Sequence, residues 1–141
     1  MAGDLEAVRT ELADEHRQVM GLVGRLESHR ALAGLEALLE ELHHTLVDHF
    51  AHEQFPGGLY ECLGAQEAGA HGELRILVRE HCTLLSDVRG LLENAKRAEP
   101  ADSEMLLGGV AELIAGLRAH ERREHRLADS LVEAQSGTGT T

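Results

Sequence analysis

Stripes of leucine at helical spacing run through four segments of this chain, and each stripe carries polar residues on its apolar side. In the last segment Leu117 is followed by His120, Glu124, Leu127 and Leu131. Apolar residues that recur every three or four positions predict an amphipathic helix that buries this face. A buried imidazole or carboxylate needs a partner. The pattern therefore predicts packed helices that bring polar groups together in one core.

The composition indicates a single all-α domain. The chain has 141 residues, of which 43% are hydrophobic and only 2% are aromatic. Leucine dominates the apolar residues and β-branched residues are sparse, which favours helix over strand. We expect helices over about residues 4–30, 35–53, 73–97 and 103–133.

The breaks between these segments predict the topology. Gly34, Pro56 with the glycines after it, and Pro100 interrupt the helical pattern. Residues 59–72 are expected to form a short connector after the second helix. Short connections favour an up-down-up-down four-helix bundle, which we expect to occupy residues 1–134. Residues 135–141, rich in Gly, Ser and Thr, are expected to be a disordered tail.

The net charge, the first residues and the length of the apolar runs argue against several classes of partner and location. A formal net charge of -12 repels phosphate backbones, so neither nucleic acid nor an anionic membrane is an expected partner. The first residues lack a basic and apolar leader, and no apolar run approaches the ~18 residues of a membrane span. We expect a cytoplasmic protein. Cys62 and Cys82 are expected to be reduced thiols outside any site.

Six polar residues fall on the apolar stripes and are the candidate metal ligands. They are His16, His49, Glu53, His81, His120 and Glu124. Two of the pairs have HxxxE spacing, which places the two side chains one helical turn apart. A single core histidine is usually satisfied by a protein partner, but six such groups together favour a metal, because a cation satisfies imidazoles and carboxylates at once.

Other polar residues compete less well for the site. His29, His44, His52, His71 and His125 fall off the stripes or in breaks, and surface positions are expected for them. His43 lies nearer the core face and is a candidate supporting group. His125 is an alternative ligand from the last helix.

Two further side chains are expected to lie away from the site. Tyr60, in the connector, is expected to cap a helix or lie at the surface, although it can also approach the centre. Glu121 is expected on a solvated face beside Arg118 and Arg122.

A weak internal repeat divides the chain into two halves. Glu15-His16 and Glu80-His81 each open an apolar stripe, and HxxxE follows the histidine 33 and 39 residues later. The halves therefore look like two copies of one helical hairpin. Two such hairpins pack naturally as a bundle in which facing residues converge at one level.

The ligand types narrow the choice of metal. Imidazole and carboxylate without thiolate disfavour copper(I) and structural zinc and suit iron, with manganese the second choice. Two carboxylates can bridge two ions. A ferritin-like site needs ExxH in each of two helices, whereas Glu40/His43 and Glu41/His44 both belong to the second helix.

The same residues resemble those of the hemerythrin-like, or HHE cation-binding, domains. The resemblance covers the chain to about Glu133 and rests on the motifs that contain the six candidates, with Phe50 inside the first HxxxE and Phe55-Pro56 after it. It implies a four-helix bundle with a non-heme di-iron centre, in which two carboxylates bridge the ions and histidines are terminal ligands. An oxide or hydroxide is the expected further bridge.

The resemblance also implies a class of function. Family members bind O2 or respond to oxygen, iron, nitric oxide or peroxide. The oxygen-carrying members have HxxxH in the third helix, whereas Leu77 and Leu85 lie one turn on either side of His81 here. We expect redox chemistry, sensing or detoxification, and a sensor would need an unidentified protein partner. The alternatives are a non-catalytic carrier or store of O2 or iron, and a bundle whose polar core only fixes helix register.

Overall fold

The computed structural model describes residues 2–54, 58–66 and 68–139 and confirms the all-α expectation. Four helices are long, and they lie close to the predicted segments. The helical elements are α1 (Ala2–Ser28), α2 (Leu35–Gln54), α3 (Leu59–Gln66), η1 (Ala68–Ala70), α4 (His71–Lys96), η2 (Pro100–Asp102) and α5 (Ser103–Gly139). No strand occurs among the described residues.

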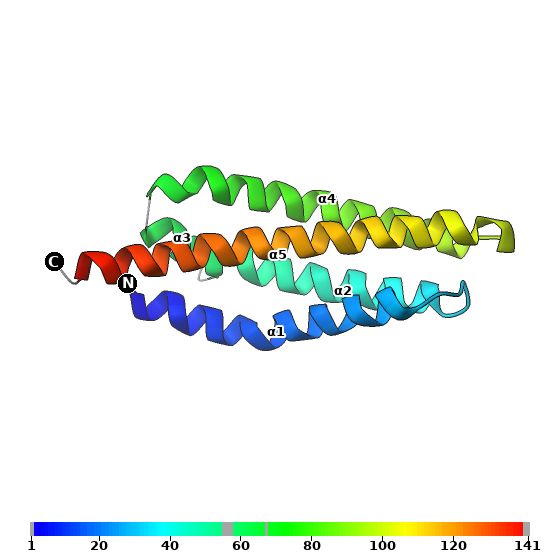
Figure 1. Cartoon of the computed structure of the whole chain (residues 1–141), viewed down its shortest axis with the longest axis horizontal. Helices are drawn as coiled ribbons and strands as arrows, with labels where there is room; N and C mark the ends of the chain where they lie inside the picture. Colours follow the sequence, from blue (N-terminus) through cyan, green and yellow to red (C-terminus); the bar gives the residue numbers. More distant parts are fainter. Residues whose placement is uncertain (1, 55–57, 67, 140–141) are drawn as a thin grey trace.

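The four long helices pack against each other with alternating directions, and both ends of the described chain lie at the same end of the molecule (Figure 1). The packed pairs are α1 with α2, α2 with α4, α4 with α5, and α1 with α5. Gly34 has a φ of 82°, which only glycine adopts without strain, and it permits the reversal between α1 and α2. The short helix α3 lies at the end that holds the termini.

Two segments differ from the prediction. The expected connector contains α3, which also packs against α1 and α2. The last helix continues to Gly139, whereas a disordered tail was predicted from residue 135. No proline interrupts this stretch, so each further residue can add a backbone hydrogen bond to the helix. Only the backbone freedom of that one residue is lost at each step. The Phe55–Gly57 part of the predicted turn and the last two residues of the tail lie outside the described residues.

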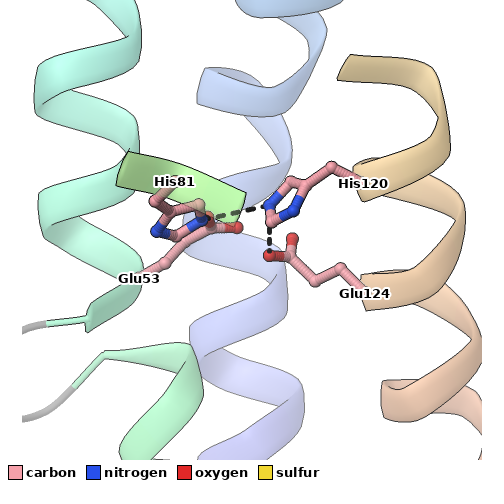
Figure 2. A group of neighbouring side chains, drawn as sticks. All are labelled: Glu53, His81, His120 and Glu124. Carbon is pink, nitrogen blue, oxygen red and sulfur yellow. Dashed lines mark hydrogen bonds and ion pairs between the residues drawn. The ribbon is translucent and has the colours of Figure 1, made fainter. Parts of the chain in front are cut away.

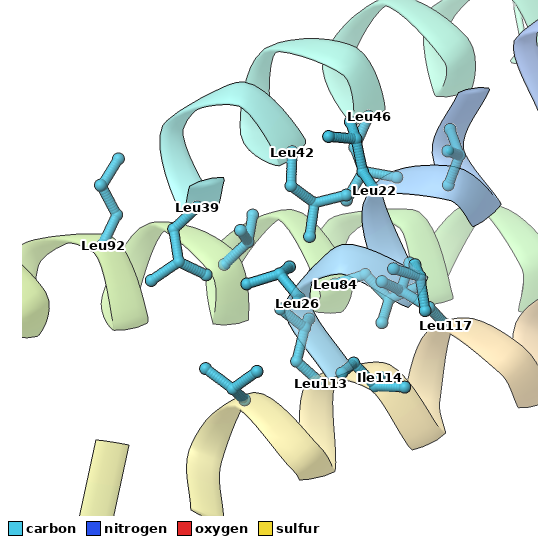
Figure 3. Packing of buried hydrophobic residues seen from close by; sticks show 14 of the residues in the cluster. Leu22, Leu26, Leu39, Leu42, Leu46, Leu84, Leu92, Leu113, Ile114 and Leu117 are labelled. Atoms are coloured by element: carbon cyan, nitrogen blue, oxygen red, sulfur yellow. The ribbon is translucent and has the colours of Figure 1, made fainter. Parts of the chain in front are cut away.

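Aliphatic residues from all four long helices fill most of the interior, and Figure 3 shows their packing in part. The long cluster includes Val19, Leu46, Phe50, Leu84 and Leu117, none more than 5% exposed. A second, smaller cluster lies beside α3. Its buried members are Leu59, Tyr60, Ala70, Leu74, Leu77 and Ala128.

A layer of polar side chains separates the two apolar clusters. On α4, His81 lies between Leu84 of the long cluster and Leu77 of the small cluster. On α5, residues 120–124 lie between Leu117 and Ala128. The helical period places these polar residues on the buried face of each helix. Their positions between the two clusters place them at the same level along the bundle.

Within the part of the chain that the structure describes, no helix combines the length and the apolar character needed to span a lipid bilayer.

Candidate metal centre

The six predicted ligands lie in two neighbouring groups. The inner group consists of Glu53, His81, His120 and Glu124, all buried (Figure 2). The outer group consists of His16, His49 and Glu121. In each group, one ligand atom from every residue lies within 4.8 Å of the others, which is compatible with a bound metal ion.

The inner group joins α2, α4 and α5. HxxxE spacing on α5 places His120 and Glu124 on one face, where Nε2 lies 3.6 Å from Oε2. Glu53 enters from α2, and its Oε1 lies 3.2 Å from Nε2 of His81. The Nε2 atoms of His81 and His120 are 3.0 Å apart. Two imidazoles and two carboxylates thus point toward one small volume.

Hydrogen bonds to the other ring nitrogen fix the orientation of three histidines. Nδ1 of His120 lies 2.9 Å from a carboxylate oxygen of Glu80, and Nδ1 of His49 lies 3.2 Å from one of Glu15. Nδ1 of His81 contacts Oε1 of Gln54. A carboxylate or amide oxygen accepts, so each Nδ1 carries a proton, and in the neutral ring Nε2 is then free to bind a metal.

The internal repeat now has a physical explanation. In both halves, the glutamate before the first histidine orients the histidine of the following HxxxE motif. Glu15 does so for His49, and Glu80 does so for His120. The sequence showed the spacing but gave these two glutamates no role.

The Nε2 atoms of His81 and His120 face each other at 3.0 Å in a buried volume beside the carboxylates of Glu53 and Glu124, which is an arrangement suited to a cation. Nε2 of His49 and Oε1 of Glu53 are also buried without a hydrogen-bond partner among the described residues. A cation satisfies all of these atoms, since imidazole nitrogen and carboxylate oxygen are its usual ligands.

The protonation of the group follows from its burial. Burial and the adjacent carboxylates of Glu124 and Glu121 raise the pKa of Glu53 well above its usual range. Burial alone would raise the pKa of Glu124, but its contacts with Glu53, His120 and Tyr60 lower it. Burial lowers the pKa of His81 to about 3, so this imidazole stays neutral and available as a ligand.

The outer group differs from the prediction at Glu121. This residue was expected on a solvated face, but its side chain is only 6% exposed and its Oε2 lies 2.7 Å from Nδ1 of His16. The contact with Glu121 raises the pKa of His16. His49 links the two groups, because its Nε2 lies 3.4 Å from Oε2 of Glu53. The spacing of four from Leu117 was the available signal for the burial of Glu121.

Tyr60 also differs from the prediction, which favoured a cap or surface position. Helix α3 carries it into the inner group, where it is 5% exposed. Its hydroxyl donates to Oε2 of Glu124 at 2.7 Å and lies 2.9 Å from Nε2 of His81. Phe50 stacks on His81, with ring centroids 3.8 Å apart. The two aromatic rings therefore restrain the His81 imidazole.

The remaining candidates lie outside the inner group. His125 is half exposed and packs edge-on against His16, with ring centroids 5.0 Å apart. His43 is half-buried on α2, and none of its described contacts reaches either group; burial and nearby Arg89 lower its pKa. Cys82 is a free thiol that points to solvent.

A cavity of about 250 Å³ reaches the site from the surface. Its polar lining includes His16, His49, Glu53, Glu124 and His125, and its apolar walls include Leu12, Ala13, Leu59 and Ala128. Water occupies roughly 30 Å³ in the liquid. The cavity is therefore large enough to admit small molecules to the ligand atoms.

Comparison of the chain with protein-family models, curated proteins and solved structures found no match.

Proposed function

We propose that the protein is an iron-binding, hemerythrin-like four-helix bundle whose di-iron centre binds or reacts with O2, peroxide or nitric oxide. The observation that carries the proposal is the pair of Nε2 atoms of His81 and His120 that face each other at 3.0 Å, flanked by the carboxylates of Glu53 and Glu124. A cation at this point would be ligated by both imidazoles and both carboxylates together.

The residues divide naturally between two ions. His81 and His120 would hold one ion, His16 and His49 the other, and Glu53 and Glu124 would bridge them. Iron in such a site supplies one-electron chemistry toward O2, peroxide and nitric oxide. The chain orients the imidazoles through Glu15 and Glu80. The cavity admits the small molecule.

Protein prepared under iron-replete conditions is expected to contain about two iron atoms per chain, because six converging ligands exceed what one octahedral ion shares with solvent. Elemental analysis after desalting gives this number directly. Less than half an equivalent of iron or manganese would overturn the proposal. It would favour the alternative function, in which the buried polar residues bind no metal and serve only to fix how the helices align with one another.

The reduced protein is expected to oxidise in air without reversible O2 loading, and the ferric form is expected to consume peroxide. Carboxylate ligands favour the higher oxidation state by their charge, and the cavity gives solvent access to the site. Visible spectra before and after dithionite, followed by a peroxide assay with free iron as control, test this. Reversible O2 loading without peroxide loss would identify a carrier instead.

A further inference from the structure

Glu121 is a buried carboxylate that the six predicted ligands do not include. Its side chain is 6% exposed, and neither of its oxygens has a hydrogen-bond partner among the described residues. A carboxylate held out of water in this way needs a compensating cation. The residue therefore requires an explanation of its own.

The contact with His16 reaches only one of the two oxygens. Nδ1 of His16 approaches Oε2 of Glu121 to 2.7 Å, which is an ion pair when the imidazole is protonated. His125 lies farther away, with its Nε2 4.0 Å from the same oxygen, and is itself half exposed. Oε1 is buried without a hydrogen-bond partner among the described residues, so it remains available to a cation.

A third side chain, that of His49, lies close to both. Ligand atoms of His16, His49 and Glu121 lie within 4.8 Å of one another, and the three residues come from α1, α2 and α5. Metal–ligand bonds of about 2.0–2.3 Å place two ligands of one ion at most ~4.6 Å apart. Three ligands from three helices can thus reach one ion after shifts of a few tenths of an ångström.

We propose that Glu121 is a ligand of the outer ion, which it binds together with His16 and His49. This inference rests on the proposed function and adds a third carboxylate to the centre. The chemical class of the ion is a divalent first-row cation such as Fe2+, which accepts mixed imidazole and carboxylate ligation.

The two ions should then differ in how easily they exchange. The imidazoles of His16 and His49 line the cavity together with Glu53 and Glu124, whereas those of His81 and His120 are 1% exposed and do not line it. Solvent and chelators therefore reach the outer ion first. The outer ion should leave first and bind last.

Glu121→Gln tests the role of the carboxylate with almost no change in shape. Anaerobic titration with Fe2+ should give two ions for the wild type and one for Glu121→Gln, with affinity for the second ion weakened at least about 100-fold. Glu112→Gln makes the same chemical change at an exposed position of α5 and should still bind two ions.

The outcomes separate this inference from the proposed function. A wild-type protein that binds no iron overturns both. Two ions with unchanged affinity in Glu121→Gln overturn only the role of Glu121. If the carboxylate merely pairs with protonated His16, the variant should keep both ions and lower the Tm of the metal-free protein.

A second measurement needs no variant and remains informative if Glu121→Gln fails to fold. In a crystal of the iron-loaded wild type, anomalous diffraction locates each ion independently of the protein atoms. An oxygen of Glu121 is expected within about 2.0–2.3 Å of one iron peak. A distance above ~3.5 Å from both peaks overturns the inference.

Discussion

Replacing His120 or Glu53 with alanine is expected to lower bound iron from about two atoms per chain to fewer than one. His120 loses the Nε2 that faces His81, and Glu53 loses the carboxylate that contacts both His81 and His49. Both residues are 1% exposed, so solvent cannot easily replace the missing ligand. Elemental analysis of purified variants, with circular dichroism to check folding, measures the effect.

His29→Ala and His71→Ala are the matched controls. Nε2 of His29 contacts the carbonyl of Ala33 at the turn between α1 and α2, and His71 is exposed at the start of α4. Neither belongs to the inner or outer group, so both variants should keep about two iron atoms. Equal losses in all four variants, or none in any, would show that the apolar stripes identified the wrong residues.

The affinity for iron is expected to rise steeply with pH. The raised pKa of Glu53 means that the metal-free protein holds a proton there, and the raised pKa values of His120 and His16 favour their charged forms. Metal binding displaces these protons, because the ligands must be deprotonated. His81 contributes little above its pKa of about 3, because it is already neutral.

Each displaced proton changes the affinity by about tenfold per pH unit, so acidification from pH 8 to pH 5 should weaken binding by at least about 1000-fold. Competition with a chelator under anaerobic conditions measures the affinity at each pH. Proton release into a weak buffer measures the number of protons directly. An affinity that stays constant over this range would mean that none of these groups is a ligand.

Helical spacing predicted most of the fold. The stripes located four long helices, and the polar residues His81, His120 and Glu124 on those stripes are buried as expected. Spacing succeeds here because each helix is long enough for its apolar face to be unambiguous. It also placed His81 and His120 on that face.

Spacing failed where the neighbouring element decides the outcome. Glu121 follows Leu117 by four residues, but the arginine after it resembles a surface pattern, and the sequence does not show that His16 on another helix faces it. Tyr60 reaches the site because α3 packs against α1 and α2. The placement of so short a helix depends on the elements around it, which the helical period of its own residues does not encode.

The polar layer between the two apolar clusters has a consequence for how the molecule comes apart. Leucine side chains hold the long cluster together without help, whereas the small cluster beside α3 is separated from it by charged and imidazole groups. The proposed ions would couple the two ends into one cooperative unit. Without them, the end that holds α3 would be a separate subglobal unit that opens at a lower free energy than the rest. Removal of the metal is therefore expected to expose Tyr60 and its neighbours while the leucine-packed end stays folded.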